Sequence, residues 1–192
     1  MQVRVGSAQR PVMGETVCGD AFVVVPFARG TLLCLADGLG HGPAARVASD
    51  AACSYAREYA DMPLEAMIRG IDKVLRSTRG AAVSLVTFSA QCLQFVGIGN
   101  VELRSFARVP IAPPTTPGIV GQGVRKVRIW EYPIVLGDLF VLMSDGISTR
   151  FELDELAHLA PQALADTLLA RHHKSHDDAC CAVVRIVAAG IV

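Results

Sequence analysis

The chain has 192 residues, of which 52% are hydrophobic and 19% are charged. This composition excludes an intrinsically disordered chain, and the length suits one domain with a core that needs no disulfide or metal to hold it together. The 18 Lys and Arg balance the 18 Asp and Glu, so no excess of positive charge would attract nucleic acid. We therefore expect a single domain over residues 1–192 and no nucleic-acid partner.

Two observations bear on the compartment. The N-terminal segment MQVRVGSAQR lacks the apolar run of a signal peptide, and no apolar stretch approaches the about 20 residues of a membrane span. The six cysteines form no Cys-x-x-Cys pair, which is typical of reduced thiols that pack as small hydrophobic side chains. We expect a cytoplasmic protein, a monomer, with no membrane partner.

Hydrophobic periodicity predicts the elements in chain order. The predicted strands lie at 21–27, 31–37, 81–89, 92–99, 101–107, 124–132, 138–145 and 179–189, and the predicted helices at 43–60, 63–78 and 153–172, the last interrupted at Pro161. The Pro- and Gly-rich segment 111–123 is predicted as one ordered loop, because strand patterns resume on both sides. Strands 81–131 have no helices between them, which favours a layered α+β domain with antiparallel sheets over a doubly wound fold.

Five aspartates share one feature, since each lies at the end of a predicted strand. Asp37 and Asp145 follow strands and are each followed by glycine, whereas Asp20 and the pair Asp177-Asp178 precede strands. If these strands are antiparallel neighbours, all the carboxylates lie at one rim, where like charges repel and raise one another's pKa values. Oxygen ligands favour Mg²⁺ or Mn²⁺ over Zn²⁺ as the cation that relieves this repulsion. The alternative is that each Asp-Gly step is an ordinary turn.

Four motifs, taken together and in this order, resemble the metal-dependent PP2C-type (PPM) protein serine/threonine phosphatases. They are Gly19-Asp20, Asp37-Gly38-x-Gly40-His41-Gly42, Ser144-Asp145-Gly146-Ile147 and Asp177-Asp178-Ala179. The short Asp-Gly-Leu-Gly-His-Gly form and the segment GIGN at 97–100 are similar to the bacterial branch of SpoIIE- and RsbX-type phosphatases.

The resemblance implies a four-layer α-β-β-α sandwich of two antiparallel sheets flanked by helix pairs, with two divalent cations, Mn²⁺ or Mg²⁺, at one edge. It also implies a role for each matching residue. Asp37 would bridge both ions, Asp20 and the Gly38 carbonyl would bind the first, and Asp145 and Asp177 would complete the second. Asp178 and Gly146 would support these ligands from behind, and His41 is a candidate general acid.

The family pattern is not complete in this chain. Leu39 stands where larger relatives have a histidine after Asp-Gly. The sequence does not identify the counterpart of their phosphate-binding arginine: Arg4 and Arg10 are the candidates, and the alternative is that both side chains are simply solvated. These departures leave a non-catalytic, phosphoprotein-binding domain as an alternative. A dinucleotide-binding reading of residues 31–60 fits less well, because Pro43 replaces the third glycine and Asp37 would face a pyrophosphate.

The implied activity is hydrolysis of phosphoserine or phosphothreonine by attack of a metal-bridging hydroxide on phosphorus. The implied partners are phosphorylated STAS-domain scaffold proteins of the stressosome type, so that the enzyme would reset a bacterial stress-signalling pathway. The alternative substrate is a free anti-anti-sigma factor, as for SpoIIE-type relatives.

Overall fold

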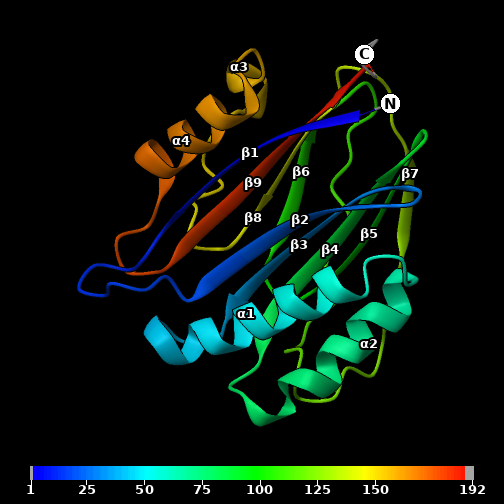
Figure 1. The fold of residues 1–192 in the computed structure, drawn as a ribbon. Helices are drawn as coiled ribbons and strands as arrows, with labels where there is room; N and C mark the ends of the chain where they lie inside the picture. The colour runs from blue at the N-terminus through cyan, green and yellow to red at the C-terminus, as the bar shows by residue number, and fades with distance from the viewer. Residues whose placement is uncertain (1, 189–192) are drawn as a thin grey trace.

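The computed structural model describes residues 2–188, which form two antiparallel β-sheets stacked face to face between two layers of helices (Figure 1). One sheet has the order β1-β9-β8-β6 and the other has the order β2-β3-β4-β5-β7. The strands are β1 (Gln2–Arg10), β2 (Asp20–Phe27), β3 (Gly30–Gly38), β4 (Ala81–Ser89), β5 (Cys92–Ile98), β6 (Glu102–Phe106), β7 (Trp130–Pro133), β8 (Leu139–Met143) and β9 (Ala179–Val187). The predicted α-β-β-α sandwich is therefore confirmed.

The helices form one pair on each outer face (Figure 1). They are α1 (Gly42–Glu58), α2 (Leu64–Val74), α3 (Leu153–Leu156) and α4 (Pro161–His172), and the short 3₁₀ helix η1 (Leu75–Ser77) follows α2. The predicted break at Pro161 is the start of α4, where proline is compatible with the first helical turn. In the described part of the chain, no helix is both long and apolar enough to cross a membrane.

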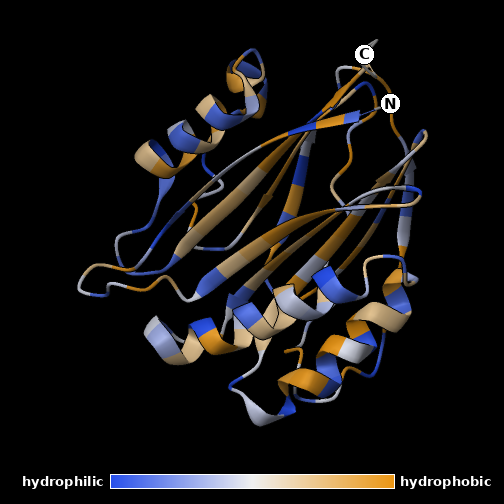
Figure 2. Cartoon of the chain, in the orientation of Figure 1, coloured by the Kyte–Doolittle hydropathy of each residue, from blue (hydrophilic) through white to orange (hydrophobic). Residues whose placement is uncertain are grey.

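Period-2 alternation assigns the strand side chains to three hydrophobic clusters, one between the two sheets and one between each sheet and its helix pair. On β3, Leu32, Cys34 and Ala36 face the helices α1 and α2, while Leu33 and Leu35 face the second sheet. Figure 2 shows hydrophobic residues running along the strands of both sheets and mixed faces on the helices. The space between the sheets is therefore apolar along most of its length, and a polar residue there stands out.

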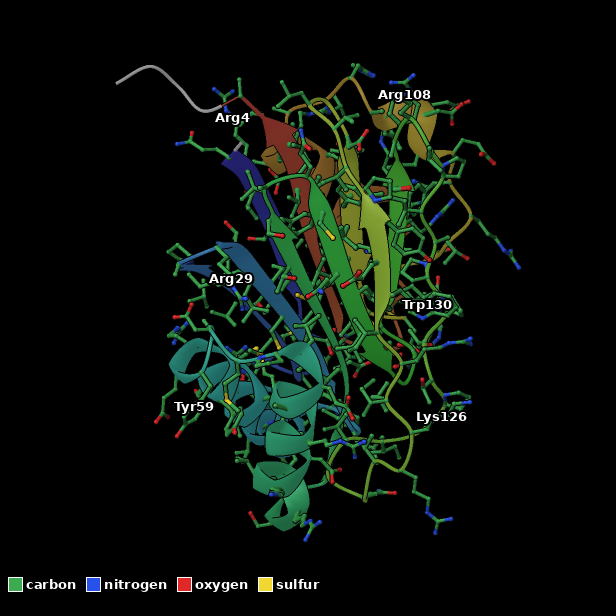
Figure 3. The ribbon with its side chains drawn as sticks, turned by 90° about the vertical axis from the view of Figure 1, so that its right-hand side faces the viewer. Arg4, Arg29, Tyr59, Arg108, Lys126 and Trp130 are labelled. Carbon is green, nitrogen blue, oxygen red and sulfur yellow. The ribbon has the colours of Figure 1, made fainter. Side chains whose placement is uncertain are left out.

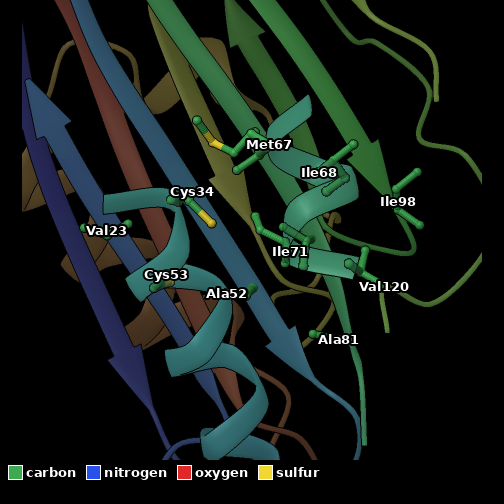
Figure 4. Close-up of a cluster of buried hydrophobic side chains, with 14 of the residues drawn as sticks. Val23, Cys34, Ala52, Cys53, Met67, Ile68, Ile71, Ala81, Ile98 and Val120 are labelled. Carbon is green, nitrogen blue, oxygen red and sulfur yellow. The ribbon is translucent and has the colours of Figure 1, made fainter. Parts of the chain in front are cut away.

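The helices α1 and α2 cover their sheet in different ways (Figure 4). α1 presents fully buried alanines, Ala48 and Ala52 among them, so its backbone lies close to β3. α2 fills the remaining space with larger side chains, Met67, Ile68 and Ile71, all with no exposed surface. The close approach of α1 matters for the site, because α1 begins at Gly42, only a short turn after Asp37 and Gly38 at the end of β3.

Two segments differ from the prediction. The predicted strand at 124–132 is a strand only from Trp130. The backbone N–H groups of Gly121, Gly123 and Val124 bond to the Asp72 carboxylate of α2 instead of joining a sheet. Residues Gln2–Arg10, for which no strand was predicted, form β1 and pair along their whole length with β9. The last predicted strand extends to 189, and residues 189–192 lie outside the described residues.

Candidate metal centre

Two of the predicted ligands face each other across neighbouring strands. Asp20 begins β2, Asp37 lies near the end of β3, and the antiparallel register pairs them directly. Because directly opposite residues share one face of a sheet, both side chains point into the space between the two sheets. Asp20 is 1% exposed. This rim is where the apolar filling between the sheets ends.

Asp145 and Asp177 come from the second sheet. Asp145 follows β8 and Asp177 precedes β9, so the antiparallel β8–β9 pairing brings both to the same rim. Ser144 joins the two sheets there, since its hydroxyl donates a hydrogen bond to Asp20 Oδ2 at 2.6 Å and accepts one from the Cys180 N–H at 3.0 Å. The structure thus brings the four predicted carboxylate ligands together.

The electrostatics of the rim are those of crowded carboxylates. Burial raises the pKa of Asp37 most, and the negative charges of Asp20, Asp145 and Asp177 raise it further. Burial likewise raises the pKa of Asp20, with the charges of Asp178 and Asp177 adding to the effect and the Ser144 hydrogen bond opposing it. Burial and the charge of Asp145 raise the pKa of Asp177. The folded chain therefore disfavours the charged forms of Asp20, Asp37 and Asp177.

These groups fit a divalent cation in donor chemistry and in charge. Among residues 2–188, none of the ion pairs involves these four aspartates, so no Lys or Arg compensates them. Within the same residues, no three His, Cys, Asp or Glu side chains converge tightly enough to enclose one ion by themselves. A backbone carbonyl and water would therefore have to complete the coordination shell of each ion at this rim. The ligand set remains a prediction.

Asp178 has a different task from Asp177. Its side chain is 2% exposed, and it accepts the Val12 N–H on Oδ1 and the Gly19 N–H on Oδ2, both at 2.8 Å. These bonds fix the segment that leads into Asp20. The carboxylate of Asp178 is therefore occupied by the backbone, and its role in supporting the metal ligands stays a prediction.

The two glycines of the Asp-Gly motifs lie where a side chain would not fit. A Cβ on Gly38 would overlap the Ala45 carbonyl of α1, and a Cβ on Gly146 would overlap the Asp178 carbonyl. Gly38 therefore allows the first turn of α1 to pack against the end of β3. Gly146 allows the turn after Asp145 to pack against the segment that carries Asp177 and Asp178.

His41 lies at the mouth of the site, where it immediately precedes α1. Its Nδ1 is 2.8 Å from Glu15 Oε1, and the side chains are 64% and 30% exposed. This contact engages the Nδ1 of His41, a residue that also lines the cleft over the carboxylates. Leu39, which replaces the histidine of larger relatives, is held by its N–H to the Gly80 carbonyl at 3.0 Å.

Three functional groups were not assigned a role from the sequence. Asn100 donates to Asp145 Oδ2 at 2.7 Å, Ser144 bonds Asp20, and Glu15 contacts His41. Asn100 and Ser144 belong to two of the family-like motifs, GIGN and Ser-Asp-Gly-Ile, so the sequence did indicate their place near the site. Glu15 carries no local signal, because it meets His41 only through the fold.

The two candidate phosphate-binding arginines lie on β1. Arg4 pairs with Arg185 near the far end of β9 from the site (Figure 3). Arg10 is at the near end, but its Nη1 lies 3.1 Å from His173 Nε2. Neither side chain lines the cleft that opens onto the carboxylates.

A cleft of about 570 Å³ opens onto the carboxylates and is called the catalytic cleft below. Its walls come from the Asp37–His41 turn, from the GIGN turn and from the long loop before β7. The lining residues are Asp37, Leu39, Gly40, His41, Ala82, Gly99, Asn100, Thr115, Pro117, Gly118, Ile119, Asp145 and Asp177. Three predicted site aspartates and His41 therefore share one solvent-accessible cleft, while Asp20 and Asp178 lie behind it.

Known proteins resemble this chain over most of its length. The family model "Stage II sporulation protein E (SpoIIE)" matches residues 28–187. The phosphoserine phosphatase RsbX of Bacillus subtilis (strain 168) is 26% identical over 139 residues, which is 70% of each chain.

Solved structures agree with the family match. A chain from a structural study of the bacterial stressosome, described there as a modular system adapted to control secondary messenger signalling, superposes with a TM-score of 0.92 at 29% identity, covering 96% of this chain and 100% of that one. RsbX in complex with magnesium gives 0.86 at 20% identity, covering 95% and 94%. The catalytic domain of the serine/threonine phosphatase PstP with two manganese ions gives 0.79 at 17% identity, covering 97% and 99%. Because the family model spans most of the chain and the PP2C fold is matched almost end to end, the chain belongs to the SpoIIE family of PP2C-type protein serine/threonine phosphatases.

Proposed function

We propose that the chain hydrolyses phosphoserine or phosphothreonine on STAS-domain scaffold proteins of a stressosome in the cytoplasm, and so resets a bacterial stress-signalling pathway. The observation that carries the proposal is a cluster of four aspartates: Asp37, Asp145 and Asp177 line one cleft, and the buried Asp20 lies behind it. Burial and neighbouring negative charges raise the pKa values of Asp20, Asp37 and Asp177. Such a cluster is costly for folding and has a clear use in binding cations and phosphate together.

The carboxylates divide into two overlapping sets in this proposal. Asp37 belongs to both sets, Asp20 and the Gly38 carbonyl to the first, and Asp145 and Asp177 to the second. Two Mg²⁺ or Mn²⁺ ions, when bound, supply acidity to a coordinated water and neutralise charge on the phosphoryl oxygens. Ser144 and Asn100 hold Asp20 and Asp145 in place by the hydrogen bonds given above.

The remaining residues of the cleft would act on the substrate directly. His41 would donate a proton from Nε2 to the departing serine or threonine oxygen, while Glu15 holds Nδ1. The Asp37–His41 turn and the loop 115–119 would flank the phosphorylated side chain, because they form two of the three walls of the catalytic cleft.

The choice of substrate rests on the relatives. One similar chain comes from a study of the stressosome and another is the phosphoserine phosphatase RsbX. The SpoIIE family match supports a second candidate, a free phosphorylated anti-anti-sigma factor. Both candidates carry the phosphate on a folded protein, which an open cleft at the molecular surface can accommodate.

A single comparison tests the proposal. The protein, with Mn²⁺, is incubated separately with a phosphorylated STAS scaffold, a phosphorylated anti-anti-sigma factor and p-nitrophenyl phosphate, and phosphate release is measured, with Asp37→Asn as the matched inactive control. Faster release from the scaffold supports the stressosome assignment, and faster release from the free factor replaces it. Binding of the phosphoproteins without release of phosphate from any substrate would mean that the domain is non-catalytic.

A further inference from the structure

Three hollows follow one another along the loop before β7, beginning at the catalytic cleft. The cleft shares Pro117, Gly118 and Ile119 with a neighbouring hollow of about 290 Å³, here called the connecting hollow. The connecting hollow in turn shares the segment 122–125 with a third depression of about 450 Å³, here called the cationic groove. One loop therefore lines all three hollows, from the carboxylate centre to a more distant part of the surface.

The cationic groove lies between α2 and this loop. Lys73 and Arg76 line one side and Arg125 lines the other, while Lys126 lines the adjoining connecting hollow. All four side chains belong to exposed residues, and among residues 2–188 none of the four has a carboxylate within ion-pair distance. The whole chain has a formal net charge of zero, so four uncompensated cations in one place are a marked asymmetry.

The acidic residues beside the groove are already engaged. Asp72 is 6% exposed, and its Oδ1 accepts backbone N–H groups from Gly121, Gly123 and Val124 at 2.8 to 3.2 Å. Glu65 pairs with Arg69 at 2.9 Å. Asp72 thus shapes the groove by holding the loop against α2. The positive charge of the groove stays largely available to a partner.

We propose that the connecting hollow and the cationic groove form a docking track for an acidic segment of the phosphoprotein substrate. This segment lies on the same face of the substrate as the phosphorylated residue. The inference rests on the proposed phosphatase function and adds a substrate preference to it. Charge complementarity selects the occupant: an acidic segment would pair with Lys73, Arg76, Arg125 and Lys126 while the phosphate enters the catalytic cleft. Such rim charges contribute mainly to association and selectivity.

Synthetic peptides test the track. Two phosphoserine peptides of the same length are compared, one with four glutamates beside the phosphoserine and one with glutamines in their place, each made with the run before or after the phosphoserine. We expect one acidic peptide to have a kcat/KM about tenfold higher than its glutamine counterpart through a lower KM, with the advantage fading at high salt. Equal kcat/KM for the acidic and neutral peptides in both orientations would overturn the proposal.

Charge reversal locates the effect. The double variant Arg76→Glu/Arg125→Glu should lose the preference for the acidic peptide and keep wild-type turnover of p-nitrophenyl phosphate, which is too small to reach the groove. Arg29→Glu is the matched control, because Arg29 is exposed on the β2–β3 turn, on the other side of the molecule from Lys126 (Figure 3). An Arg29→Glu effect as large as that of the double variant would contradict the assigned location.

Binding separates this proposal from the phosphatase proposal. Binding of the labelled acidic peptide to the Asp37→Asn protein is measured by fluorescence anisotropy, which needs no turnover. Lys73→Glu, made in the same Asp37→Asn protein, serves as an independent second variant. Weaker binding to Lys73→Glu supports the track even if the wild type releases no phosphate. Unchanged binding to Lys73→Glu and to the double variant rejects the track even if the enzyme is active.

Discussion

Asp20 and Asp37 occupy directly opposed positions on β2 and β3, with both side chains in the space between the sheets. Leu33 and Leu35 fill the same face of β3 farther along the strand, so the register that builds the core also sets the spacing of the two carboxylates. A shift of one residue in this pairing would turn one aspartate toward α1. The metal centre is therefore positioned by the apolar register of the sheet.

The first prediction concerns the stability of the metal-free protein as a function of pH. Burial and neighbouring charges raise the pKa values of Asp20, Asp37 and Asp177 in the folded chain. Above the ordinary carboxyl pKa of about 4, the unfolded chain has released protons that the folded chain still holds. The free energy of unfolding should therefore fall as the pH rises from about 4 through neutrality. Urea unfolding in EDTA at several pH values measures this dependence. A free energy of unfolding that increases with pH over this range would contradict the crowding of the carboxylates.

Cation binding should reverse this loss. Because divalent ions bind the folded rim, the apparent stability should rise by RT ln(1 + [L]/Kd), which is about 2.7 kcal/mol at one hundred times Kd. Thermal unfolding at pH 7.5 is measured with EDTA and with millimolar Mn²⁺ or Mg²⁺. Asp37→Asn provides the control, since its midpoint should respond much less to the metal. A wild-type midpoint that is indifferent to both ions would argue against a cation site.

Substitution of the proposed ligands should separate the shared ligand from the single-ion ligands. Asp37→Asn removes a ligand common to both sets, so the loss of turnover should exceed the about 10–100-fold typical of outer-shell changes. Asp145→Asn weakens one set only, and excess Mn²⁺ should restore part of its activity. Activity is followed with p-nitrophenyl phosphate over a range of Mn²⁺ concentrations. If excess metal restores Asp37→Asn as well as it restores Asp145→Asn, the shared role belongs elsewhere.

The sequence predicted most of the fold because the relevant signals are local. Alternating apolar residues identify β3 and β4, and the Asp-Gly steps mark Asp37 and Asp145 at strand ends. The segment 124–129 was misassigned because its apolar residues pack against the hydrophobic cluster under α1 and α2 without joining a sheet. The hydrogen bond from the Val124 N–H to Asp72, a residue of another element, holds the start of this segment away from the sheet. The His41–Glu15 contact was likewise not predicted, since 26 positions separate the two residues and no periodicity relates them.

The proposed acid function of His41 should depend on the leaving group. His41→Ala should lower kcat for a phosphoserine peptide by about 100-fold, because the serine oxygen must be protonated as it departs. The same variant should hydrolyse p-nitrophenyl phosphate almost normally, since nitrophenolate departs without a proton. Glu15→Gln keeps a hydrogen-bonding oxygen for His41 and should give a smaller effect of the same kind. Equal losses on both substrates would indicate that His41 serves binding and not proton transfer.

The adjacent aspartates Asp177 and Asp178 should respond in opposite ways to the same substitution. Asp177 lines the catalytic cleft, so Asp177→Asn removes a negative ligand and lowers affinity for Mn²⁺. Relief of repulsion with Asp145 should leave the metal-free fold as stable as the wild type or more so. Asp178 uses both carboxylate oxygens on the N–H groups of Val12 and Gly19. Asparagine has one acceptor oxygen, so Asp178→Asn must leave one of these N–H groups facing an amide NH₂.

An unsatisfied buried donor costs about 1–3 kcal/mol, which corresponds to a fall of several degrees in Tm for a domain of this size. Thermal unfolding in EDTA therefore ranks the two variants by stability, and a Mn²⁺ titration of activity ranks them by metal affinity. Asp177→Asn should have the lower metal affinity and Asp178→Asn the lower Tm. The reverse order in both measurements would place the metal ligand one residue later in the chain, at Asp178, and would assign the backbone-holding role to Asp177.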